Sequence, residues 1–182
     1  KAVKAKLSGP PDTAIKKVLK HEGGYVDHKN DPGGATKYGI SLRFIRQSNT
    51  DLDLDGDGDI DADDIKEMTE DKAKEIYKDK FWNPYNYDII KDPDVATKIF
   101  DITVNAGPRQ SHKLVQRACN RKNSELDVDG LLGTQSLRSI NQIGKELLPE
   151  ICKVQADFYK SLVVKKPELE VFLKGWLRRA EA

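Results

Sequence analysis

Two short stretches near the N-terminus combine residue types that could carry out acid–base chemistry. They read H-E-G-G-Y (21–25) and D-P-G-G-A-T-K-Y-G-I (31–40). A glycine-rich loop of this kind can bring a second carboxylate and a hydroxyl back towards the first acid. Two carboxylates beside an extended substrate are typical of a hydrolytic site. The candidates for chemistry are therefore Glu22, Asp31 and Thr36.

The element that must position Glu22 is a short amphipathic helix. Glu22 continues its apolar stripe, which is formed by Ile15, Val18 and Leu19. Partial burial and the negative end of the helix dipole both disfavour ionisation, so we expect a raised pKa for Glu22. A carboxylic acid that keeps its proton near neutral pH suits a general acid. The alternative is a helix-end residue that pairs with a lysine.

Local signals around this helix predict an arm, a cap and a hairpin. Residues 1–11 are expected to form a flexible arm. Asp12 or Thr13 is expected to cap the helix and Gly23-Gly24 to end it. The glycine-rich residues 25–40 are expected to form a small β-like hairpin.

Caps and apolar periodicity predict further helices along the chain. Helix starts are expected at Ser41, Thr69 and Asp92-Pro93, and helical patterns cover residues 110–122, 134–142, 146–164 and the segment from Pro167. One aromatic cluster is expected in a loop: Phe81, Trp82, Tyr85 and Tyr87. The chain is thus predicted to be mostly α (α+β), with two lobes, a small hairpin and an acidic loop.

The acidic loop, residues 53–64, reads D-L-D-G-D-G-D-I-D-A-D-D and matches the loop of a calcium-binding EF-hand. Its expected ligands are Asp53, Asp55, Asp57, Asp59 (through its carbonyl), Asp61 and Asp64. An aspartate at the last ligand position resembles loops of the dockerin type. A solvated acidic loop is the alternative, although its aspartates would repel one another without a counterion. Because the loop is single rather than paired, we expect a structural Ca²⁺.

Composition excludes several classes of protein. With 34% charged residues and a net charge of +1, nothing in the overall charge favours nucleic acid. No apolar run approaches the roughly 18 residues that span a bilayer, and no signal peptide is visible at the N-terminus. For Cys119 and Cys152, two buried free thiols are expected, with a single disulfide as the alternative.

Residues 21–40 strongly resemble the opening signature of glycoside hydrolase family 108, the N-acetylmuramidases of bacteria and phages. The resemblance continues through T-E-D-K-A-K-E-I-Y-K-D-K-F-W (69–82) and F-D-I-T-V-N-A-G-P (100–108). It ends in V-Q-R-A (115–118) and D-V-D-G-L-L-G-T-Q-S-L (127–137), which resemble the family's predicted peptidoglycan-binding region. The acidic loop departs from the family pattern and looks inserted.

This resemblance implies a lysozyme-like fold that cleaves the β-1,4 bond between N-acetylmuramic acid and N-acetylglucosamine. Glu22 matches the family's catalytic acid, and Asp31 and Thr36 match the acid and hydroxyl that follow it in related lysozymes. Glu22 would protonate the glycosidic oxygen, while Asp31 would stabilise the developing charge or activate a water that Thr36 positions. Inversion is expected by analogy. For Asp31 a turn-forming role before proline is the alternative, and for Thr36 a plain loop residue.

Other residues could contact the substrate. Tyr25 and Tyr38 are candidates for lining the sugar groove, with packing as the alternative. Asp101 and Asn105 could face the cleft or make structural hydrogen bonds. Trp82 is expected in the core rather than as a platform for a sugar.

The expected organisation is a catalytic lobe over residues 12–107 and a helical, peptidoglycan-binding-like lobe over 108–182, packed on the first. The expected partners are peptidoglycan glycan strands, with no nucleic acid and no membrane span, and the chain is expected to be a monomer. It would act outside the cytoplasm, after removal of a signal or with a helper such as a holin. A non-catalytic peptidoglycan-binding or scaffold protein and a calcium-regulated interaction module are the competing functions.

Overall fold

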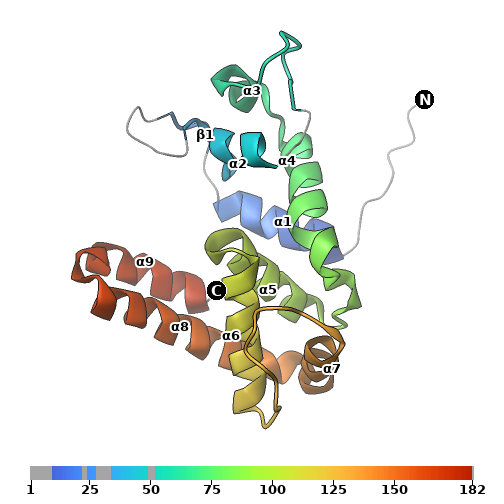
Figure 1. The fold of residues 1–182 in the computed structure, drawn as a ribbon, viewed down its shortest axis with the longest axis vertical. Coiled ribbons are helices and arrows are strands. Elements are labelled where there is room, and N and C mark those ends of the chain that lie inside the picture. Colours follow the sequence, from blue (N-terminus) through green and yellow to red (C-terminus); the bar gives the residue numbers. More distant parts are fainter. Residues whose placement is uncertain (1–9, 22–23, 28–33, 49–51, 182) are drawn as a thin grey trace. The chain divides into compact units, whose positions relative to one another are not determined.

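The computed structural model describes residues 10–21, 24–27, 34–48 and 52–181, and the chain forms two compact units, residues 1–80 and 81–182. Helices dominate the described residues, whose one sheet has two short strands (Figure 1). The predicted mostly helical fold with a small hairpin is therefore confirmed. In this described part, no helix is both long and apolar enough to cross a membrane.

Helix α1 (Pro10–His21) begins earlier than the sequence suggested. Proline fits the first helical turn because the N–H that it lacks would have no partner there. The predicted cap at Asp12 or Thr13 is wrong, since Asp12 lies in the first turn and the last two residues of the expected arm are helical. The apolar stripe is as predicted, with Ile15 and Val18 buried.

The hairpin joins β1 (Thr36–Lys37) to β2 (Ile40–Ser41). Its two-residue turn has φ of 53° at Tyr38 and 76° at Gly39, the combination that matches the twist of the flanking strands. A tyrosine pays a steric penalty at positive φ, which a glycine avoids. The Tyr77 hydroxyl of α4 (Glu70–Tyr77) donates a 2.8 Å hydrogen bond to the Tyr38 carbonyl and fixes the turn.

Three short helices complete the first unit. The Ser41 hydroxyl accepts a hydrogen bond from the backbone N–H of Phe44 and caps α2 (Leu42–Gln47), as predicted. The Thr69 hydroxyl likewise caps α4. Helix α3 (Ala62–Glu67) was not predicted. It is only six residues long and starts inside the acidic loop, where the run of aspartates was interpreted as ion ligands rather than as the start of a helix.

The aromatic cluster lies in helical turns, so the predicted loop is wrong. A π turn covers Lys78–Trp82, and two 3₁₀ turns cover Asn83–Tyr85 and Tyr87–Ile89. Trp82 is fully buried, as expected, and its indole N–H donates to the Asp88 carboxylate at 2.9 Å. Burial of the Trp82 and Tyr87 rings favours compact turns over an open loop, because these two rings remove much apolar area from water.

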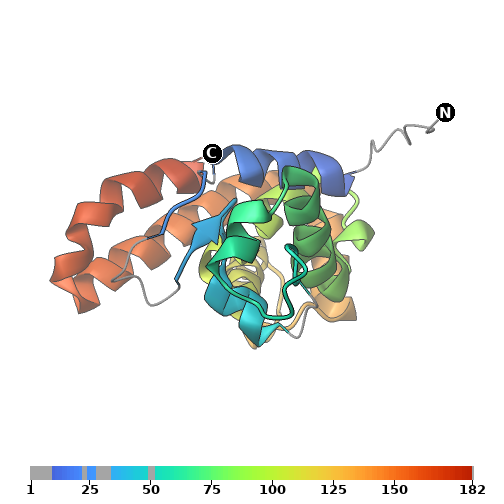
Figure 2. The same cartoon turned by 90° about the horizontal axis from the view of Figure 1, so that it is seen from above.

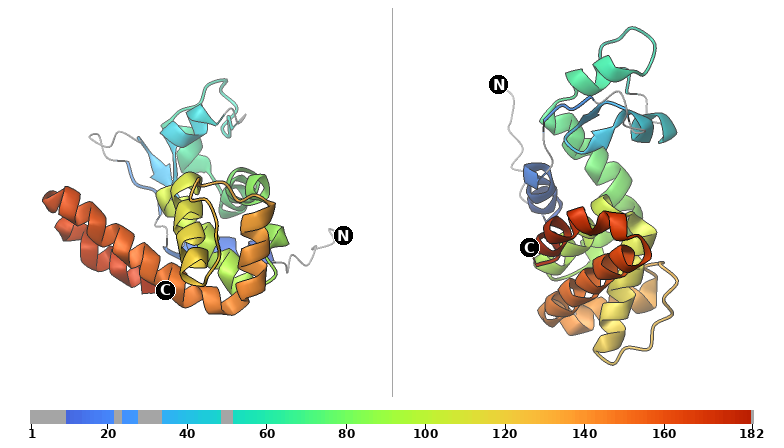
Figure 3. Two further views of the ribbon diagram at one scale, coloured as in Figure 1. Left: turned by 60° about the horizontal axis from the view of Figure 1, so that its bottom comes forward. Right: turned by 90° about the vertical axis from the view of Figure 1, so that its left-hand side faces the viewer.

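The second unit consists mainly of five helices among its described residues: α5 (Pro93–Ala106), α6 (Pro108–Arg121), α7 (Thr134–Ile143), α8 (Leu147–Lys165) and α9 (Glu170–Glu181). Helix α6 packs against α5 and α8. Helices α8 and α9 run side by side as an antiparallel pair (Figures 2 and 3). Cys119 is buried and Cys152 only half-buried, and both are free thiols, so the expectation of two buried thiols holds for the first alone.

Charged residues of α5 hold the end of α9. The buried Lys98 ammonium donates to the carbonyls of Arg179 and Ala180, at 2.9 and 2.8 Å. A cation at this position satisfies carbonyls that a helix end leaves without intrahelical partners, and it complements the helix dipole. Asp101 pairs with the Arg179 guanidinium at 3.1 Å. The C-terminal helix is thereby fixed to the core of its unit.

Candidate functional site

The predicted acid–base residues can be located only in part. Glu22 and Asp31 lie outside the described residues, and their catalytic roles stay predictions. Glu22 follows directly in sequence on His21, the last residue of α1. Thr36 lies in β1, is half-buried, and its hydroxyl donates a long 3.4 Å bond to the Gly34 carbonyl.

A backbone bridge brings the two sequence stretches together. Val26 and Thr36 exchange two N–H···O bonds of 2.8 Å, in antiparallel orientation. Residues that follow Glu22 are thus paired with the strand that holds the predicted hydroxyl. The glycine-rich loop was predicted to bring these two stretches together, and the Val26–Thr36 bridge is a contact between them.

The two tyrosines proposed for the sugar groove differ in their surroundings. Tyr25 is 40% exposed, and desolvation followed by the charge of Asp27 raises its pKa. Tyr38 is half-buried, with the Lys37 ammonium 5.6 Å from the centre of its ring. Contact of either residue with substrate stays a prediction.

Asp101 and Asn105 make structural contacts within the second unit. Asp101 is buried and forms the ion pair with Arg179 described above. The Asn105 side-chain amide donates to the Tyr159 hydroxyl at 3.2 Å. These contacts agree with the hydrogen-bonding alternative, and substrate binding by this pair remains untested.

The acidic loop places its carboxylates in two close groups. Carboxylate oxygens lie within 4.8 Å of one another in each group, the first formed by Asp53, Asp55 and Asp57 and the second by Asp59, Asp61 and Asp64. Hard oxygen donors at this density suit a divalent cation such as Ca²⁺. Gly56 and Gly58 have φ of 79° and 98°, so the chain turns sharply there.

Backbone N–H groups orient these carboxylates. Asp53 accepts from Gly56 and Gly58, at 2.6 and 3.0 Å. Asp64 is 1% exposed and accepts from Leu54 and Asp61, at 2.6 and 2.7 Å. Because a carboxylate offers about four lone-pair sites, the two bonds to Asp53 leave room for a cation there.

Charge repulsion within the loop shows in the pKa values. The neighbouring charge of Asp57 and partial desolvation raise the pKa of Asp59. At Asp64 burial works to raise the pKa, but the backbone N–H groups of Asp61 and Leu54 hold it below its ordinary value. The loop therefore keeps at least one buried carboxylate ionised beside several others, and a bound cation would reduce the repulsion between these charges.

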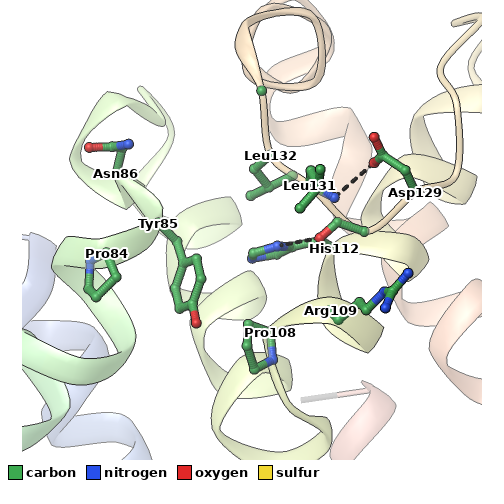
Figure 4. Close-up of a pocket in the computed structure, with 11 residues that line it drawn as sticks. Pro84, Tyr85, Asn86, Pro108, Arg109, His112, Asp129, Leu131 and Leu132 are labelled. Carbon is green, nitrogen blue, oxygen red and sulfur yellow. Dashed lines mark hydrogen bonds between the residues drawn. The ribbon is translucent and has the colours of Figure 1, made fainter.

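The second unit contains a pocket of about 780 Å³ that sequence reasoning did not identify (Figure 4). Tyr85 and Pro84 line one side and Arg109 and Asp129 the other, as Figure 4 shows. The remaining lining residues are Asn86, Pro108, His112, Gly130, Leu131, Leu132 and Gly133. Part of the signal was in the sequence, because D-G-L-L-G lines this pocket and Gln116 of V-Q-R-A bonds to that loop. The sequence did not show that the two segments lie close together in space.

One buried glutamine and one buried histidine hold the pocket's loop, residues 129–133. The Gln116 amide, only 2% exposed, donates towards the Asp129 carboxylate and the Leu131 carbonyl, at 2.8 and 3.0 Å. Its carbonyl accepts from the Gly130 N–H at 2.9 Å. His112 bridges the Gly130 carbonyl and the Tyr87 hydroxyl through its two ring nitrogens, at 3.1 and 2.8 Å.

Gly130 itself is required at the centre of this loop. Its φ is 85°, and a Cβ atom there would lie 2.7 Å from the Arg109 carbonyl oxygen. Only glycine fits such a backbone approach at positive φ. The first glycine of D-G-L-L-G is therefore required for steric reasons.

Comparisons with known proteins agree with these features. A family model described as "Glycosyl hydrolase 108" matches residues 15–107, and one described as "Predicted Peptidoglycan domain" matches residues 110–181. The solved structure "Structure of Brucella abortus SagA" is 27% identical with a TM-score of 0.73, and the match covers 94% of this chain and 89% of that one. None of the curated proteins compared with the chain matches it. The chain therefore belongs to the glycosyl hydrolase 108 family and carries a predicted peptidoglycan domain, which makes it a glycoside hydrolase that acts on peptidoglycan at the cell wall.

Proposed function

We propose that this chain is an N-acetylmuramidase that hydrolyses the β-1,4 bond between N-acetylmuramic acid and N-acetylglucosamine. The observation that carries the proposal is the family match over residues 15–107, which includes Glu22, Asp31 and Thr36 in the order that the motif requires. The peptidoglycan domain over residues 110–181 supports the same substrate. The enzyme would act on glycan strands as a monomer.

In this proposal Glu22 protonates the glycosidic oxygen while the bond to the anomeric carbon breaks. Asp31 stabilises the positive charge that develops on the sugar ring or helps to activate the attacking water. The Thr36 hydroxyl positions that water. Its only hydrogen bond among the described residues is the long one to Gly34, so it has capacity for another partner.

The bond can be identified from the released fragments. Purified peptidoglycan is digested with the chain, the products are reduced with borohydride, and the new reducing ends are identified by mass spectrometry. A muramidase leaves a reduced N-acetylmuramic acid. A reduced N-acetylglucosamine, or an anhydro sugar formed without water, would overturn the proposed bond, and no release of fragments would favour the scaffold alternative.

For the acidic loop we propose a structural Ca²⁺ held by Asp53, Asp55, Asp57, Asp61 and Asp64 with the Asp59 carbonyl. Two observations support it: the close carboxylate groups of the loop and the raised pKa of Asp59 among like charges. The ion would offset part of the negative charge of the loop and fix the segment between α2 and α3. Binding to the folded state alone would stabilise that state by mass action.

Calcium titration followed by thermal melting tests this site. Wild type and Asp63→Asn should melt at a higher temperature with Ca²⁺, because Asp63 belongs to neither carboxylate group and pairs with Lys66 at 3.9 Å. Asp57→Asn can keep the acceptor for the Asp59 N–H but loses a ligand charge, so it should need more Ca²⁺. If Ca²⁺ did not change the melting temperature of wild type, a structural site would be rejected. If Ca²⁺ changed the activity without changing the melting temperature, a regulatory ion would be favoured.

A further inference from the structure

The pocket of the second unit combines opposite charges with an apolar wall. Resting on the proposed function, we propose that it binds the zwitterionic amino-acid head of a peptidoglycan stem peptide. Arg109 would contact the carboxylate of that head, and Asp129 its ammonium group. This assigns the peptide, rather than the sugar, to the pocket of Figure 4.

Both charged groups have capacity for a ligand. Arg109 is exposed, and its guanidinium makes no hydrogen bond or ion pair with another residue of the described chain. One Asp129 oxygen accepts from Gln116 and from the Leu131 N–H, both at 2.8 Å. The bonds from Gln116 and Leu131, together with the positive charge of Arg109, hold the pKa of Asp129 below its ordinary value, so the carboxylate is ionised beside the guanidinium. A guanidinium matches a carboxylate through two parallel hydrogen bonds, and a free carboxylate oxygen suits an ammonium group.

The apolar wall suits the aliphatic part of such a ligand. Leu131 is 68% exposed, although it lies on a loop that buried side chains hold in place. Leu132, Pro84 and Pro108 extend the apolar surface, and the Tyr85 ring packs edge-on to His112 with 5.1 Å between ring centres. Apolar walls with a few placed polar groups are typical of small-ligand sites.

The loop is pre-organised, which lowers the entropy cost of binding. Gln116 and His112 fix the backbone of Gly130 and Leu131 from beneath. The Arg109 stem lies over Gly130, because a Cβ there would meet Arg109 Cγ at 2.8 Å. The two charges are therefore presented by a rigid frame.

Peptidoglycan chemistry favours the peptide over the glycan here. The sugar amines are acetylated, and the lactyl carboxyl of muramic acid is consumed in the amide bond to the peptide. The glycan thus offers no ammonium group for Asp129. A stem peptide with diaminopimelate ends in a carbon that carries both a free ammonium and a free carboxylate, on an aliphatic chain.

Calorimetry on the full chain tests the proposal with three probes. These are the tripeptide L-Ala-γ-D-Glu-meso-diaminopimelate, the same peptide with its free side-chain amine acetylated, and the peptide-free disaccharide. We expect the tripeptide to bind, acetylation to weaken binding at least about tenfold, and the disaccharide to bind no better than buffer controls. Binding of the disaccharide alone, or of no probe, would overturn the proposal.

Two variants separate the charges from the fold. Arg109→Gln should weaken binding of the tripeptide at least about tenfold. Arg117 is an exposed arginine of α6 that does not line this pocket, so Arg117→Gln should leave the binding unchanged. Asp129→Asn can keep the acceptor for Gln116 and Leu131, and it should bind the acetylated and free peptides equally. Unchanged tripeptide binding in both pocket variants would refute the assignment. Failure of the proposed bond specificity would appear separately, in the fragments released from peptidoglycan.

Discussion

Replacing Gln116 by leucine removes the side chain that ties the pocket loop to α6. The amide has two N–H groups for three acceptors, which are Asp129 at 2.8 Å, the Leu131 carbonyl at 3.0 Å and the Ser136 hydroxyl at 3.2 Å. Its carbonyl accepts one further bond from the Gly130 N–H. Counting about three bonds at once, one of them to a charged group, the expected loss of unfolding free energy is roughly 3 to 5 kcal/mol.

Urea denaturation followed by tryptophan fluorescence and circular dichroism measures this loss. Gln135→Leu is the matched control, because Gln135 is exposed at the start of α7, and it should change the stability by less than about 0.5 kcal/mol. If Gln116→Leu stayed within about 1 kcal/mol of wild type, the loop would not depend on this side chain, and its role in pre-organising the pocket would be wrong.

Three further predictions concern buried groups of the second unit. Tyr87→Phe removes a hydroxyl bonded to Thr103 at 2.6 Å and His112 at 2.8 Å, so unfolding by urea should show a loss of about 1 to 3 kcal/mol. Burial lowers the pKa of His112, so the unfolded state binds a proton more readily than the folded state. The free energy of unfolding should therefore fall as the pH drops below about 6.5, and His112→Gln should make this pH dependence less steep. Burial raises the pKa of Cys119 to about 12, so a thiol reagent should label Cys152 before Cys119 in the folded chain and both once it is unfolded.

Local signals in the sequence predicted local structure well. Ser41 and Thr69 cap helices as expected, because a cap depends on a side chain and an N–H two or three residues away. The hairpin was also predicted from its glycines. Helix α3 was missed because it is short and shares its N-cap, Asp61, with the acidic loop.

The pocket could not be predicted because its contacts are distant in sequence. Gln116 reaches Gly130 and Leu131 across a turn and a loop, and His112 joins Tyr87 to the same loop. Periodicity identified the helix that carries both residues but gave them no role. The family motif V-Q-R-A contains Gln116 but not His112, and the structure gives the physical role of both residues.

In the proposed function, Glu22 is the general acid of a peptidoglycan hydrolase. The most direct measurement compares the clearing of purified cell walls by wild type, Glu22→Gln and Glu75→Gln. Glu75 is an exposed residue of α4 that pairs with Lys72 at 3.2 Å, so it serves as a control for loss of a surface charge. Wild type and Glu75→Gln should clear the walls, while Glu22→Gln should be slower by about 100-fold or more at unchanged melting temperature. Equal clearing by Glu22→Gln would contradict this role.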